Sequence, residues 1–149
     1  MLDAAGIARL IPHSGRMCLL ARLERWDAHT IVCSAMSHRD ADNPLRTASG
    51  LLAPCAIEYA AQAMALHGAL IGQPADDAAN AARPGFLASA RGVQFHRLRL
   101  DDLAGALTIE AQRHAGDAQQ ILYHFRVQHA GQPVAEGRAA VVLNTPLAA

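Results

Sequence analysis

The sequence contains no lysine, so all 13 basic residues are arginines, and 13 acidic residues balance their charge. Neither sign forms a run along the chain. The chain therefore lacks the strongly basic surface that is typical of proteins that bind nucleic acids or membrane surfaces, and we expect neither partner. The absence of lysine indicates a coding bias toward GC-rich codons rather than a function.

Cysteine is also scarce, and its spacing excludes two kinds of site. Cys18, Cys33 and Cys55 stand singly inside apolar segments, without a CxxC pair. Neither a zinc site nor a disulfide framework is predicted, and we expect the three thiols to be reduced and buried. The histidines likewise have no ligand spacing, so the sequence predicts no metal and no cofactor.

Long apolar runs and a leader pattern are missing too. The first residues do not combine a basic region with an apolar segment, and no apolar run reaches the roughly 20 residues that a membrane span needs. The cytoplasm is therefore the expected location. A chain of 149 residues has the length of one domain, which we expect to span residues 1–149.

The most informative segment is a predicted helix at residues 54–71 that is apolar on almost every side. Between residues 55 and 71 the only strongly polar side chains are Glu58, Gln62 and His67. A helix of this kind belongs inside a protein, so we expect Glu58 to be a buried carboxylate and a candidate acid–base group. Gln62 is four residues later and can orient that carboxylate from the same helix face. A purely structural role for the Glu58–Gln62 pair is the alternative.

The remaining segments predict a short helix and six strands around this long helix. The short helix is expected at residues 3–10, and the strands at 17–26, 29–36, 86–96, 105–114, 120–129 and 132–144. Polar connections are expected at 37–49 and 74–84. This order predicts an α+β domain in which an antiparallel sheet wraps around one long central helix.

Three segments resemble hotdog-fold 3-hydroxyacyl-(acyl carrier protein) dehydratases, particularly the divergent branch found in aryl-polyene gene clusters. They are the proline-histidine turn and first strand at 11–23, the helix with its acidic residue and glutamine at 51–63, and the strand pair at 86–95 and 107–111. The resemblance implies a hotdog fold, edge-to-edge dimers with the site at the subunit interface, and a 3-hydroxyacyl thioester as substrate.

The resemblance also suggests roles for individual residues. Glu58 matches the family's helix acid, and the backbone amides near Cys55 and Ala56 are expected to bind the thioester carbonyl. The family's catalytic loop histidine has no counterpart, because Asn43 stands at roughly its place and an asparagine cannot accept a proton. Asn43 and Gln62 are expected to contact the substrate. His13, in the proline-histidine turn, is the candidate substitute base, and a structural role is its alternative.

Two other histidines and three arginines are further candidates for a role in the site. His38 is a second candidate base, although we expect it on a surface loop. His67 is too far along the helix to share a reacting atom with Glu58, and we expect it to be a hydrogen-bonded helix histidine. Arg91, Arg97 and Arg99 could contact a carrier protein or a phosphate, with a solvated strand face as the alternative.

These observations favour a lyase, a dehydratase or dehydratase-like subunit that acts on carrier-protein-bound 3-hydroxyacyl thioesters in fatty-acid or polyketide-like synthesis. Two alternatives stay open: a hotdog acyl-thioesterase in which Glu58 activates water, and a non-catalytic hotdog partner in a heterodimer. The sequence decides neither between acyl carrier protein and coenzyme A nor between homodimer and heterodimer, and it does not specify the acyl chain.

Overall fold

A computed structural model of the chain describes residues 2–13, 15–72, 85–117 and 119–143. Its helices are α1 (Ala4–Ala8) and α2 (Ala56–Ile71), and its strands are β1 (Arg22–Trp26), β2 (Thr30–Ala35), β3 (Gly85–Phe95), β4 (Leu107–Gly116), β5 (Gln120–His129) and β6 (Gln132–Leu143). This confirms the predicted order of elements. The connection predicted at 74–84 lies outside the described residues.

Helix α2 forms where the sequence predicts it, and its boundaries follow from local chemistry. Pro54 lies in a single 3-10 turn, Ala53–Cys55, that leads into the helix, where its missing N–H costs no hydrogen bond. Ten of the 16 residues of α2 are buried. The helix ends at Gly72, whose N–H donates to the carbonyl of Gly68.

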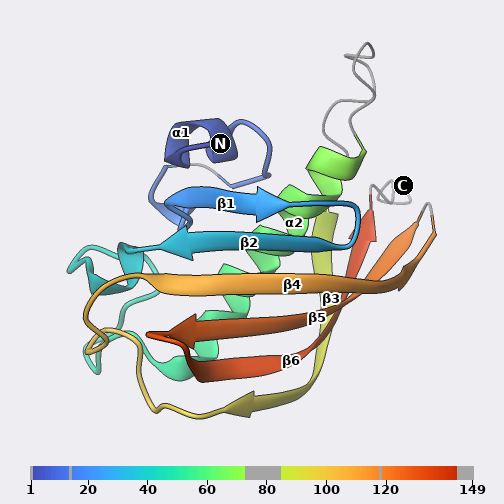
Figure 1. Ribbon diagram of the computed structural model, residues 1–149. Coiled ribbons are helices and arrows are strands. Elements are labelled where there is room, and N and C mark those ends of the chain that lie inside the picture. Colours follow the sequence, from blue (N-terminus) through green and yellow to red (C-terminus); the bar gives the residue numbers. More distant parts are fainter. Residues whose placement is uncertain (1, 14, 73–84, 118, 144–149) are drawn as a thin grey trace, which may run out of the picture.

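One antiparallel sheet has the strand order β1-β2-β4-β5-β6-β3, and it curls around α2 (Figure 1). Helix α2 contacts every strand from β2 to β6. The tightest hairpin joins β5 to β6 through Ala130 and Gly131, which have positive φ angles of 50° and 78°. A two-residue turn with positive φ at both positions matches the right-handed twist of the paired strands. The predicted antiparallel sheet wrapped around a central helix is therefore confirmed.

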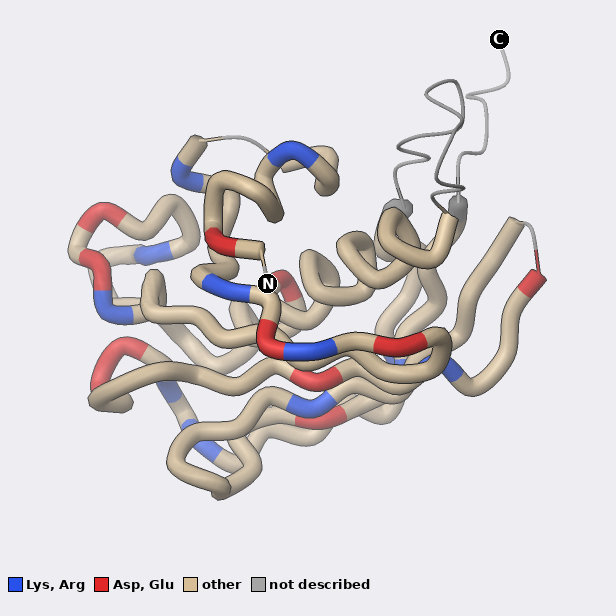
Figure 2. Tube along the Cα trace, turned by 45° about the horizontal axis from the view of Figure 1, so that its top comes forward, with Lys and Arg blue, Asp and Glu red and all other residues tan. Residues whose placement is uncertain are grey.

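The two edges of the sheet differ. The N-terminal segment covers part of β1, since Asp3 bridges to Arg22 and the N–H of Leu23 donates to the carbonyl of Leu2. Strand β3 is the opposite edge, and no described strand pairs with its outer side. Acidic and basic residues are interspersed along the chain (Figure 2). No described helix is long and apolar enough to cross a membrane.

Candidate active site

The Glu58 carboxylate lies in the first turn of α2, where Gln62 contacts it from the next turn. The Nε2 of Gln62 donates to Oε1 of Glu58 over 3.3 Å. Glu58 is not buried as the sequence predicts: its side chain is 30% exposed in the single chain. The predicted burial is wrong because Glu58 lies in the first turn on a side of the helix that is only partly buried, together with Ile57 and Ala61.

Gln62 is fully buried and connects α2 to the N-terminal segment. Its Oε1 accepts a hydrogen bond from the N–H of Leu19 over 2.9 Å, and its Nε2 donates to the carbonyl of Met17 over 2.6 Å. The amide therefore has backbone partners on both atoms as well as the contact with Glu58. Gln62 thus fixes the segment after His13 against the helix that carries Glu58.

This anchoring brings His13 and Glu58 together. The Nε2 of His13 lies 2.9 Å from Oε1 of Glu58, and the two side chains are 23% and 30% exposed. The Nδ1 of His13 is buried and has no hydrogen-bond partner among the described residues. Only Nε2 can therefore exchange a proton with a bound molecule. A carboxylate and an imidazole in contact, both reachable from solvent, form an acid–base pair.

Asn43 forms hydrogen bonds within its own loop and with Tyr59. Its Nδ2 donates to the carbonyl of Ser37 over 2.9 Å and to the hydroxyl of Tyr59 over 3.1 Å, and its Oδ1 accepts from the N–H of Leu45 over 2.8 Å. The hydroxyl of Ser37 donates to the carbonyl of Leu19, so Tyr59 donates to Ser37 over 2.7 Å. These bonds give Asn43 a structural role in its loop. Its predicted contact with substrate stays a prediction.

A small cavity separates this loop from the N-terminal segment. It has a volume of about 150 Å³, and both Cys18 and Asn43 line it. The Sγ of Cys18 donates to the carbonyl of His13 over 3.3 Å, which places the cavity beside the His13 turn. Arg16 and Asp42, both largely exposed, approach to 3.7 Å across it.

The amides at the start of α2 already have partners in the structure. The N–H of Cys55 donates to the carbonyl of Leu52, and the N–H of Ala56 donates to the carbonyls of Ala53 and Pro54. A thioester carbonyl can bind there only if the 3-10 turn opens. The prediction that Cys55 and Ala56 bind substrate through these amides therefore requires a conformational change.

Two further histidines are buried and structural. His38 is fully buried, so its predicted place on a surface loop is wrong: its Nε2 donates to the carbonyl of Leu103 over 2.9 Å. His67 is a hydrogen-bonded helix histidine, as predicted, with Nε2 on the carbonyl of Asp27 and Nδ1 on the hydroxyl of Tyr123, both at 2.7 Å. Burial lowers the pKa of both imidazoles.

The cysteines offer no metal site within the part of the chain that the structure describes. All three are free thiols. Cys33 is buried, and burial raises its pKa to about 12. Cys18 and Cys55 are only partly buried, which corrects the expectation that all three are enclosed, and burial raises their pKa as well. Neutral thiols are weak nucleophiles and metal ligands.

The sequence signals identified part of this site. The spacing of Glu58 and Gln62 predicted their contact, and the proline-histidine turn identified His13 as a candidate. The hydroxyls of Ser37 and Tyr59 were missed. Tyr59 follows Glu58 directly, and its polar group on a buried helix face is the signal that could have found it.

Comparisons with known proteins identify the family and the fold of the chain. The family described as ApeP-like, ApeP dehydratase, matches residues 5–148. No curated protein has a significantly similar sequence. Among solved structures, the dehydratase heterocomplex ApeI:P from Xenorhabdus doucetiae matches with a TM-score of 0.82 and 21% identity, covering 98% of this chain and 93% of that one.

Two other solved structures are more distant. A thioesterase from Haemophilus influenzae has a TM-score of 0.64 and 12% identity, covering 99% of this chain and 94% of that one. AziG from S. sahachiroi has a TM-score of 0.58 and 21% identity, with coverage of 91% and 98%. These likenesses establish the hotdog fold, and the family match covers nearly the whole chain. The chain belongs to the ApeP-like dehydratase family and is a dehydratase-like hotdog subunit.

Proposed function

We propose that this subunit dehydrates 3-hydroxyacyl thioesters, with His13 as the base and Glu58 as the acid. The observation that carries the proposal is the 2.9 Å contact between Nε2 of His13 and Oε1 of Glu58. His13 then supplies the proton acceptor that Asn43 cannot supply. Because both groups come from one chain, the acid–base pair needs no catalytic residue from a partner.

The proposed reaction begins with neutral His13 and protonated Glu58. Nε2 of His13 removes the proton from C2 of the substrate, the electrons of that bond form the C2=C3 double bond, and the C3–O bond breaks. Glu58 gives its proton to the leaving hydroxyl, which departs as water. His13 is then an imidazolium and Glu58 a carboxylate. Once the enoyl product has left, their direct contact returns the proton from His13 to Glu58.

Gln62 supports this reaction by positioning both groups. Its hydrogen bond to Glu58 directs the carboxylate, and its bonds to Met17 and Leu19 hold the segment that follows His13. The substrate carbonyl needs a donor as negative charge develops on it. The amides of Cys55 and Ala56 are the nearest candidates by resemblance, and this role requires the preceding 3-10 turn to open.

We further propose a second hotdog subunit as partner and an acyl carrier protein as substrate donor, in the cytoplasm. The uncovered edge of β3 supports the partner, because unpaired strand edges favour pairing with another strand. Phe95, 41% exposed, is the last residue of that strand, and Leu98, 90% exposed, follows it in the next connection. The similar Xenorhabdus protein is a heterocomplex, which favours a heterodimer over a homodimer.

The test is an assay of the purified chain with 3-hydroxyacyl carrier protein, alone and with a second hotdog subunit. Formation of the enoyl thioester, followed by mass spectrometry, is expected, and both His13→Ala and Glu58→Gln are expected to slow it by at least about 100-fold. His29→Ala is the matched control, since His29 is an exposed turn residue. Release of free thiol without enoyl product would instead indicate a thioesterase. If both variants keep full activity in the complex, the chain is a non-catalytic partner.

A further inference from the structure

The outer face of the sheet, away from α2, carries a row of basic side chains. Arg91 on β3 lies directly opposite Arg138 on β6, and Arg138 lies opposite His124 on β5. Within the described residues neither arginine forms an ion pair. Like charges at opposed positions destabilise a sheet, so this row favours binding of a negatively charged group.

The neighbouring row of the same face is arranged differently. There Arg126 on β5 lies between Glu136 on β6 and Glu110 on β4. Opposite charges therefore alternate across three strands, as expected for a face that only contacts solvent. Two adjacent rows of one face therefore differ in charge. The excess of positive charge is specific to one row and does not follow from the general composition of the sheet.

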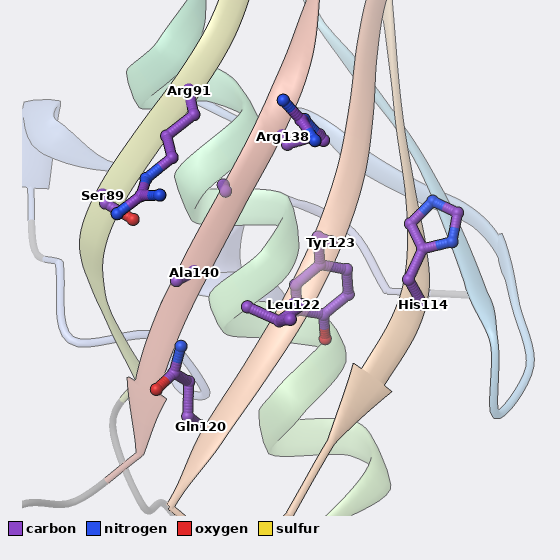
Figure 3. A pocket seen from close by; sticks show the side chains of 9 residues that line it. Ser89, Arg91, His114, Gln120, Leu122, Tyr123, Arg138 and Ala140 are labelled. Atoms are coloured by element: carbon purple, nitrogen blue, oxygen red, sulfur yellow. The ribbon is translucent and has the colours of Figure 1, made fainter.

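A pocket lies over the unbalanced row (Figure 3). It has a volume of about 400 Å³, which falls within the range of roughly 300–1,000 Å³ for small-molecule sites. Its polar lining includes both arginines with Ser89, His114 and Gln120, and its apolar lining includes Leu122 and Ala140. Leu122 is 43% exposed, so an apolar ligand group can cover it.

We propose that this pocket binds a phosphate monoester with a short apolar body. A phosphate dianion balances the two guanidinium groups, and arginine matches phosphate geometry through paired N–H donors. The apolar body would pack on Leu122 and Ala140. The pocket is separate from the acid–base pair, because the sheet lies between it and α2 (Figure 3). A partner strand at the free edge of β3 would extend the sheet and leave this outer face open.

Isothermal titration calorimetry tests the proposal with phenyl phosphate and inorganic phosphate as probes. Phenyl phosphate is expected to bind more tightly than inorganic phosphate. Arg138→Gln is expected to weaken binding of both probes by about tenfold or more, because it removes a charge-assisted hydrogen bond to the phosphate. Leu122→Ser is expected to weaken only phenyl phosphate.

The matched control is Arg22→Gln, which removes the same charge from β1 at the far edge of the sheet. An equal loss of affinity in Arg22→Gln and Arg138→Gln would show that general charge attracts the probe, and it would overturn the proposal. So would unchanged affinity in Arg138→Gln, or no binding of phenyl phosphate to the wild-type protein at about 10 mM. Circular dichroism of each variant establishes that it is folded before titration.

Discussion

Replacement of Gln62 by methionine should destabilise the protein and loosen the site at the same time. Methionine has a similar length and no amide, so the change removes all three hydrogen bonds of this buried side chain. An unpaired buried polar group costs about 1–3 kcal/mol. The hydrogen bond to the N–H of Leu19 is buried, whereas the one to the carbonyl of Met17 is only partly buried. We therefore expect the free energy of unfolding to fall by about 2–4 kcal/mol.

Urea denaturation measures this change, and steady-state kinetics measures its effect on the site. Because the segment after His13 loses its anchor, kcat should fall while KM changes little. Gln112→Met is the control: Gln112 is exposed on the outer face of β4, and a substitution there should alter the free energy of unfolding by less than about 0.5 kcal/mol. A Gln62→Met protein with the urea midpoint of the wild type would refute the anchoring role.

Three further changes test other parts of the structure. Glu58→Gln should lower the dehydration rate roughly 100-fold to 10,000-fold. It should change the free energy of unfolding, measured in urea, by less than about 1 kcal/mol, because the His13–Glu58 pair is partly exposed. Asn43→His should lower stability by about 1–3 kcal/mol without raising turnover, since an imidazole cannot reproduce the three bonds of this amide. Hydrogen bonds from Arg99 hold the pKa of Asp101 well below its usual range, so its stabilising effect is complete above pH of about 4 and is lost as the pH falls further. Urea titrations of Asp101→Asn and wild type should therefore differ more at pH 7 than at pH 3.

The sequence predicted the fold well because its signals are local and periodic. The alternation of apolar and polar side chains predicts β5, and its predicted bounds match the structure. The apolar run at 54–71 predicts α2. The spacing of Glu58 and Gln62 also fixes their contact, since residues four apart share a helix face.

The rest of the site depends on contacts between distant segments, which no local pattern encodes. His13 reaches Glu58 because Gln62 binds the backbone at Met17 and Leu19, more than 40 residues away in sequence. The local sequence predicts a polar loop residue at His38. In the structure its side chain is buried, because it donates a hydrogen bond to the carbonyl of Leu103, 65 residues later. Burial of a single histidine or glutamate is a property of the packed tertiary structure.

A double-mutant cycle on His13 and Glu58 tests the central claim most directly. Its measured quantity is kcat/KM for enoyl formation by the wild type, His13→Ala, Glu58→Gln and the double variant. If the two residues act as one acid–base unit, the double variant should lose no more activity than the more impaired single variant. Losses that multiply in the double variant, or full activity of His13→Ala, would contradict the account.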